Sequence, residues 1–164
     1  MTFEVKVRTK DLFGFTMYHA YSGLMGKIWL IFSVFCLFAA VWTWGDVSPQ
    51  GTAAFVVLGL LFTVVNPVML YFKCVKRVAK TPAYKESFRY ILTKDGFSVS
   101  QGEQSGKVSW QDLFQIVCTK KAVYFCPDPI HAQIISLEQL GEQQEKLKEF
   151  LRSQVPGDVR KKGL

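Results

Sequence analysis

The sequence predicts an α+β membrane protein in which a two-helix transmembrane hairpin is joined to a cytosolic domain of antiparallel strands. Two long uncharged apolar runs, residues 28–44 and 52–72, indicate the hairpin. Short segments of alternating apolar and polar residues after position 86 indicate the strands. Aromatic residues make up 15% of the chain, which argues against disorder because disordered chains are poor in them.

The first 23 residues predict a strand followed by a short helix. Apolar and charged side chains alternate through residues 2–9, which is typical of a strand with one buried face. Such a strand needs a partner, so we expect it to join the sheet formed by the second half of the chain. Residues 9–22 contain Leu12, Phe15 and Tyr18 at helical spacing and predict a helix at a membrane interface.

Residues 24–82 predict the hairpin, with spans at about 26–44 and 52–72. A helix needs about 20 apolar residues to cross the hydrocarbon core of a bilayer. A helix in a soluble core would keep a polar stripe, and neither run has one. Only the segment GDVSPQG separates the two runs, so the helices are expected to lie antiparallel and side by side.

Basic residues flank the hairpin on both outer sides, whereas the connecting loop carries one acid and no base. This pattern predicts a two-pass protein of the inner (cytoplasmic) membrane with both termini in the cytosol. The net charge of +7 thereby has a local explanation, and no nucleic-acid partner is expected. The bases after the second run are either a topology signal alone or also a contact for anionic lipid: Lys73, Lys76, Arg77 and Lys80.

Small and polar residues fall on one face of each predicted span, where they would let the helices approach closely. We expect three facing pairs, Ala40–Gly59, Cys36–Thr63 and Ser33–Asn66. The Asn66-Pro67 step is expected to kink the second span, because proline has no backbone N–H to donate.

Residues 83–154 predict an antiparallel domain with a final helix. Six strands are expected at residues 87–93, 97–101, 107–110, 113–119, 122–126 and 131–135. Ser136 and Gln139 form a capping-box pattern that predicts the start of a helix running to about residue 154. Together with the N-terminal strand, this order predicts a pleckstrin-homology-like split barrel. Residues 155–164 are expected to form a loose basic tail.

The domain also resembles a known family. The segment RYILTKDGFSVS, with its turn before Gly96, and the element from Ser109 to Leu113 around Trp110 and Asp112 resemble the YcxB-like bacterial membrane proteins. Ser136 stands where that family's pattern has a proline before the last helix. The resemblance implies a pleckstrin-homology-like fold and a membrane location, and it implies no activity or catalytic residues. We expect Trp110 to anchor the core and Asp112 to cap a turn.

No catalytic motif was found in the sequence. The four cysteines lack paired CxxC spacing, and two histidines supply little acid–base chemistry, so we expect no enzyme activity, metal or cofactor. The first hypothesis is a membrane-anchored interaction module that presents its domain to a protein partner or to anionic lipid. The alternative is a small membrane immunity protein that protects against a membrane-acting toxin. The expected partners are bilayer lipid and an unidentified protein, including a second copy of the chain.

Overall fold

A computed structural model describes residues 1–157 and 159–163 of the chain, so positions 158 and 164 of the predicted tail lie outside the described residues. The chain divides into two compact units. We call residues 13–76 the hairpin unit, and residues 1–12 with 77–164 the sheet unit. Helices α1 (Thr9–Ser22) and α4 (Asn66–Lys80) each continue from one unit into the other.

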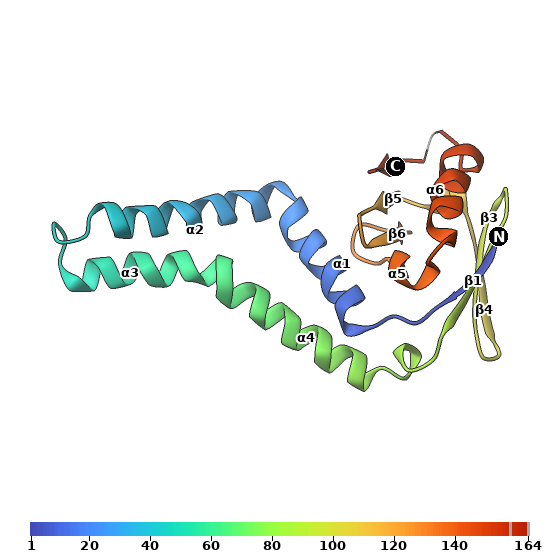
Figure 1. Ribbon diagram of the computed structural model, residues 1–164, viewed down its shortest axis with the longest axis horizontal. Coiled ribbons are helices and arrows are strands. Elements are labelled where there is room, and N and C mark those ends of the chain that lie inside the picture. The colour runs from blue at the N-terminus through green and yellow to red at the C-terminus, as the bar shows by residue number, and fades with distance from the viewer. Residues whose placement is uncertain (158, 164) are drawn as a thin grey trace. The chain divides into compact units, whose positions relative to one another are not determined.

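The first sheet of the sheet unit joins the beginning of the chain to its second half (Figure 1). Its order is β1-β2-β3-β4 and every neighbouring pair is antiparallel. The strands are β1 (Thr2–Val5), β2 (Phe88–Leu92), β3 (Gly96–Gln101) and β4 (Gln104–Ser109). Phe3 pairs with Tyr90 in the register, and their rings stack at 5.6 Å. The prediction that the N-terminal strand joins this sheet is therefore confirmed.

The second sheet has the order β7-β6-β5-β8. Its strands are β5 (Gln115–Cys118), β6 (Ala122–Cys126), β7 (Gln133–Ser136) and β8 (Lys161–Lys162). The first three are antiparallel as predicted, whereas β8 pairs with β5 in parallel. The expectation of a loose tail is wrong for the described residues, because Val155 and Val159 are buried in the core and β8 belongs to the sheet.

The core of the sheet unit lies around three aromatic side chains. Phe125 is centred 4.9 Å from Phe97 and 5.6 Å from Trp110, and all three are at most 1% exposed. The helix α6 (Gln143–Gln154) contributes the fully buried Leu147 and Leu151 to the same core. Burial of these apolar side chains is the main stabilising contribution to this unit.

The predicted final helix is broken into two pieces. A single turn, α5 (Leu137–Leu140), precedes α6, and Gly141 separates them with a φ of 52°, a conformation that favours glycine. The capping box does not form. Ser136 instead accepts a hydrogen bond from Arg8, and the side-chain amide of Gln139 bonds to both backbone groups of Lys6. Tertiary partners thus take the groups that the local motif would have used.

The hairpin unit is built from two helical arms (Figure 1). One arm contains α1 and α2 (Leu24–Trp42), which are separated at Gly23. The other is helical throughout, from α3 (Pro49–Leu60) through the π-helical turn η1 (Leu61–Val65) into α4. Ser48 accepts a hydrogen bond from the Gly51 N–H and Pro49 occupies the first helical turn, so the second arm begins with favourable helix-start residues.

Candidate functional site

The C-terminal half of α4 carries four exposed cations on one helical face. Lys73, Lys76, Arg77 and Lys80 follow the spacing i, i+3, i+4 and i+7, which places them along one side of a helix. We call this set the basic face. Within the part of the chain that the structure describes, no ion pair involves any of the four. The basic face is therefore a row of positive charge available to an anionic surface.

Another side of α4 packs against α1. Cys74 is 3% exposed, and its sulfur lies 3.4 Å from the hydroxyl oxygen of Thr16. Tyr71, one turn earlier, meets the ring of Phe13 edge to face at 5.5 Å. These contacts orient the helix, because they direct Cys74 toward α1 while the lysines around it remain exposed.

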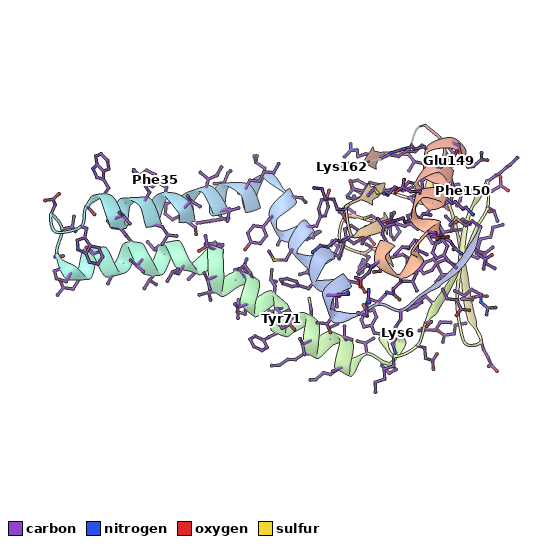
Figure 2. The ribbon with its side chains drawn as sticks, in the orientation of Figure 1. Lys6, Phe35, Tyr71, Glu149, Phe150 and Lys162 are labelled. Atoms are coloured by element: carbon purple, nitrogen blue, oxygen red, sulfur yellow. The ribbon has the colours of Figure 1, made fainter. Side chains whose placement is uncertain are left out.

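The middle of the hairpin unit exposes apolar side chains on nearly all sides. Phe35 is 63% exposed and Phe38 60%, and Figure 2 shows Phe35 pointing away from the second arm. Two helical segments, Leu24–Trp42 and Pro49–Lys80, are long and apolar enough to cross a membrane. An apolar surface of this extent on a protein marks a contact with another apolar phase or protein.

The small residues of the hairpin lie where the two arms touch. Ser33, Cys36 and Ala40 are at most 3% exposed, and Gly59 is also buried. A Cβ atom at Gly59 would lie 2.5 Å from the side chain of Leu37, so the arms approach closely because this position is glycine.

Two of the three predicted pairs, Ala40–Gly59 and Ser33–Asn66, are wrong. Gly59 faces Leu37 rather than Ala40. The hydroxyl of Ser33 donates to the carbonyl of Leu58 at 3.3 Å, whereas Asn66 bonds elsewhere. Thr63 donates to the Gly59 carbonyl of its own helix. The register follows the position of closest approach, which the loop length alone did not reveal.

A polar network replaces the missing proline hydrogen bond in the second arm. The Asn66 N–H donates to the Leu61 carbonyl, five residues back, as in a π-helix. The next donor in this pattern would be Pro67, which has no N–H, and its acceptor would be Phe62. The hydroxyl of Tyr21 donates to that Phe62 carbonyl at 2.8 Å. Asn66 in turn donates its side-chain amide to the Tyr21 hydroxyl at 3.0 Å.

The expected kink is therefore a π-turn supported by a tyrosine from the other arm. Figure 1 shows the helix changing direction between α3 and α4. Sequence reasoning located the disturbance at Asn66-Pro67 but assigned Asn66 the wrong partner. Tyr21 lies 45 positions away along the chain, and no local pattern connects the two residues.

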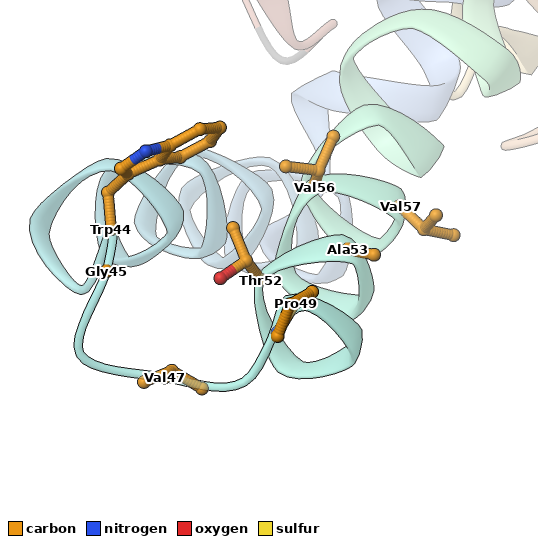
Figure 3. Close-up of a pocket in the computed structure, with 8 residues that line it drawn as sticks. All are labelled: Trp44, Gly45, Val47, Pro49, Thr52, Ala53, Val56 and Val57. Carbon is orange, nitrogen blue, oxygen red and sulfur yellow. The ribbon is translucent and has the colours of Figure 1, made fainter.

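The tip of the hairpin contains an apolar pocket (Figure 3). It lies between the connecting loop and the first turns of α3, and its lining residues are Trp44, Gly45, Val47, Pro49, Thr52, Ala53, Val56 and Val57. The polar side-chain groups of this lining are the Thr52 hydroxyl and the indole N–H of Trp44. With no charged side chain and one hydroxyl, the pocket offers apolar contact and has no group suited to acid–base or metal chemistry.

Trp110 and Asp112 occupy different environments within the helical turn η3 (Trp110–Asp112). Trp110 is 1% exposed, and its indole N–H donates to the Thr93 carbonyl at 3.0 Å. Asp112 is exposed, and the nearby N–H of Leu113 donates to the Trp110 carbonyl. Among the described residues, no hydrogen bond is found for the Asp112 carboxylate.

Burial and hydrogen bonds shift the pKa values of several titratable groups in the described part of the sheet unit. Burial raises the pKa of the Cys126 thiol to about 11 and also raises that of Cys118, so both are protonated at neutral pH. Backbone and side-chain hydrogen bonds from His131 lower the pKa of Asp128 in an exposed loop. Within the described residues, no three His, Cys, Asp or Glu side chains gather to hold a metal ion.

Two contacts in the sheet unit were missed by sequence reasoning. Arg8 and Lys10 both bind the carboxylate of Glu138, more than 120 positions away, and Lys10 makes the closer contact. The second is the pairing of β8 with β5. Neither has a local sequence signal, since each depends on how distant segments are brought together.

Comparison with known proteins concerns the sheet unit. Residues 92–151 match the family model described as YcxB-like protein. The matched segment begins at the end of β2, contains β3 to β7, and ends within α6; β1, the hairpin and β8 lie outside it. Neither curated proteins nor solved structures give a match. The resemblance inferred from the Trp110 element is thus confirmed over residues 92–151, which match the YcxB-like family model.

Proposed function

We propose that the protein is a membrane-anchored interaction module without catalytic activity. In this proposal the hairpin unit spans the inner membrane, both ends of the chain are cytosolic, and the sheet unit binds a protein partner or anionic lipid at the inner leaflet. The observation that carries the proposal is the pairing of β1, which precedes the hairpin, with β2, which follows it.

This pairing constrains how the chain can cross a membrane. Four residue pairs link β1 to β2, and the Met1 amino group donates to the Leu92 carbonyl at 2.9 Å. Strands of one sheet must lie on the same side of a bilayer, because a sheet edge cannot be exposed in hydrocarbon. The chain therefore needs an even number of crossings between β1 and β2, which two apolar helices supply.

The apolar surface of the hairpin supports insertion rather than burial in a soluble core. Only 17% of the apolar stretch of Leu24–Trp42 and 6% of that of Pro49–Lys80 are buried within the protein. Each exposed apolar side chain left in water would cost roughly 1.5–3 kcal/mol relative to burial. Bilayer hydrocarbon would cover these side chains on every side at once.

The basic face supports the proposed orientation and the lipid contact. Cytosolic segments next to membrane helices are enriched in Lys and Arg, and α4 ends with four such residues. Each base close to an anionic leaflet contributes about 1 kcal/mol of attraction. Lys27, at the start of α2, is also exposed, whereas Lys10 is paired with Glu138.

The order of elements in the sheet unit supports a pleckstrin-homology-like fold. Four antiparallel strands form one sheet, the next three form a second, and a C-terminal helix packs its leucines into the shared core. The proposal assigns no cofactor and no reaction.

Cysteine labelling of the full chain tests the topology. In a version whose four native cysteines are replaced by serine or alanine, a single cysteine is introduced at Asp46 in the loop, or at Ser105 in β4, or at Ser153 in α6. A membrane-impermeant maleimide should label D46C in intact cells and should label S105C and S153C only after lysis. All three positions are exposed.

Labelling of S105C or S153C in intact cells would contradict the orientation, and recovery of the protein in the soluble fraction would contradict insertion itself. The full chain is required, since a fragment that starts after the hairpin lacks β1 and its two buried apolar side chains, Phe3 and Val5.

A further inference from the structure

One edge of β5 pairs with β8, a short strand near the end of the chain that differs from the other strands of the sheet. Strand β8 contributes two paired residues, Lys161 opposite Ile116 and Lys162 opposite Val117. It is parallel to β5, whereas every other described strand pair is antiparallel. It also lies beyond the family-matched segment, which already contains β5, β6 and β7. In this chain, that edge of β5 is paired by a segment from outside the matched residues.

The contacts at this edge define what an occupant must provide. The N–H of Ile116, a fully buried residue, donates to the Arg160 carbonyl at 2.8 Å. A buried N–H left unpaired would be costly, so this edge requires an extended backbone. Val159 is 5% exposed and packs in the core, and the guanidinium of Arg160 lies 5.7 Å from the ring centre of Phe114.

The glycine at the end of the segment completes the pattern. Gly163 has a φ of 77°, and a Cβ atom there would lie 2.2 Å from the Cys118 carbonyl oxygen. Only glycine fits both the backbone conformation and this close approach. The edge therefore selects an extended segment with an apolar residue, a cation directly after it, and a glycine four positions after the apolar residue.

We infer that the β5 edge is a strand-docking site, occupied in the free protein by residues 159–163 and taken over by an extended peptide segment of a partner protein with the same pattern. A two-residue strand forms few ladder hydrogen bonds, so a longer peptide can displace it. Addition of a strand to a sheet edge obtains affinity from main-chain hydrogen bonds and specificity from side-chain pockets. This inference rests on the proposed function and specifies its protein partner.

Peptide binding to a shortened chain tests the inference. The full chain and a version that ends at Gly157 are purified in detergent micelles, and a fluorescein-labelled peptide of residues 157–164 is added. Fluorescence anisotropy should show saturable binding to the shortened chain. Binding to the full chain should be at least about tenfold weaker, as expected when the open state is populated about one time in ten.

Control peptides separate strand docking from charge attraction. Peptides with V159D or G163V should lose binding, because one buries a charge and the other clashes with Cys118. A scrambled peptide of the same composition should not bind. Equal binding of the scrambled peptide, or no binding to a shortened chain that keeps its near-ultraviolet circular dichroism, would overturn the inference.

A full-length variant covers the case in which the shortened chain does not fold. G163V should open the edge and allow the wild-type peptide to bind, whereas K162V, at an exposed neighbouring position, should leave the edge closed. Equal peptide binding by these two variants would also overturn the inference. The assay is performed in micelles and is independent of topology, so its failure is distinguishable from failure of the membrane-anchoring proposal.

Discussion

Side chains of the helix α5 hold residues 6–10 to the rest of the sheet unit. The Gln139 side chain forms hydrogen bonds with both backbone groups of Lys6, and the Glu138 carboxylate forms ion pairs with Lys10 and Arg8. These side chains bind the segment that connects β1 to α1.

Glu138 makes this attachment dependent on pH. The hydrogen bond and charge of Lys10, with smaller effects from Arg8 and Lys121, hold the pKa of the Glu138 carboxyl below its usual value. A carboxyl with a lowered folded-state pKa stabilises the fold above its unfolded pKa of about 4.3, and this contribution is lost as the pH falls through the lower folded value. The E138Q variant should therefore lose less stability than wild type on acidification.

Thermal unfolding of the full chain in detergent, followed between about pH 6 and pH 3, measures this difference. The control variant, E103Q, removes an exposed carboxylate that makes no ion pair within the described residues. It should lose stability on acidification as wild type does. If E138Q and E103Q respond identically to acid, the Lys10–Glu138 pair has no role in holding the segment.

At the scale of elements, close approach of the two helical arms determines the register of the hairpin. The absence of a side chain at Gly59 lets the arms meet at Leu37, and Tyr21 then reaches the carbonyl that Pro67 leaves without a donor. The apolar pattern located both helices but did not determine this alignment. Both α2 and α3 expose apolar side chains on their outer faces, so shifting one by a turn leaves the apolar character of those faces unchanged.

Disulfide cross-linking distinguishes the two registers. In a cysteine-free background, the pair L37C and G59C should cross-link on mild oxidation, because their side chains face each other directly. The pair A40C and G59C, which corresponds to the register expected from the sequence, should cross-link more slowly. Non-reducing electrophoresis after proteolysis in the loop reports the yield. Faster cross-linking of A40C with G59C would contradict the observed register.

At the scale of the whole molecule, the proposed function assigns the basic face a contact with anionic lipid. Neutralising it with K73Q, K76Q, R77Q and K80Q should reduce the anionic lipid retained by the protein, because about 1 kcal/mol of attraction is lost per base. Native mass spectrometry of protein extracted from a mixture of neutral and anionic lipids measures the retained ratio. The loss should be larger at low ionic strength, where screening is weak.

The matched control changes the same number of charges elsewhere. Lys107, Lys120, Lys121 and Lys146 are exposed on the sheet unit, and their replacement by glutamine should leave the retained anionic lipid unchanged. If both quadruple variants behave alike, the basic face contributes nothing beyond its effect on topology, and the lipid part of the proposed function fails.

The sequence by itself determined the features that depend on local pattern. Two uncharged runs predicted the apolar helices, and short apolar segments between turn residues predicted β1 to β7. The element around Trp110 predicted the resemblance to the YcxB-like family that residues 92–151 show. These properties belong to neighbouring residues along the chain, so they can be read before any folding is known.

Only the tertiary structure decided the contacts between distant residues. Ser136 and Gln139 match a capping box. In the structure, however, the Ser136 hydroxyl accepts a hydrogen bond from Arg8, and the Gln139 side chain donates one to the Lys6 carbonyl. Asn66 pairs with Tyr21 rather than Ser33 because the arms align at Gly59. The tail, polar in composition, becomes a strand because the edge of β5 has an unpaired backbone to offer. In each case a long-range partner competes with the local one, and the free energy of the assembled fold determines which partner wins.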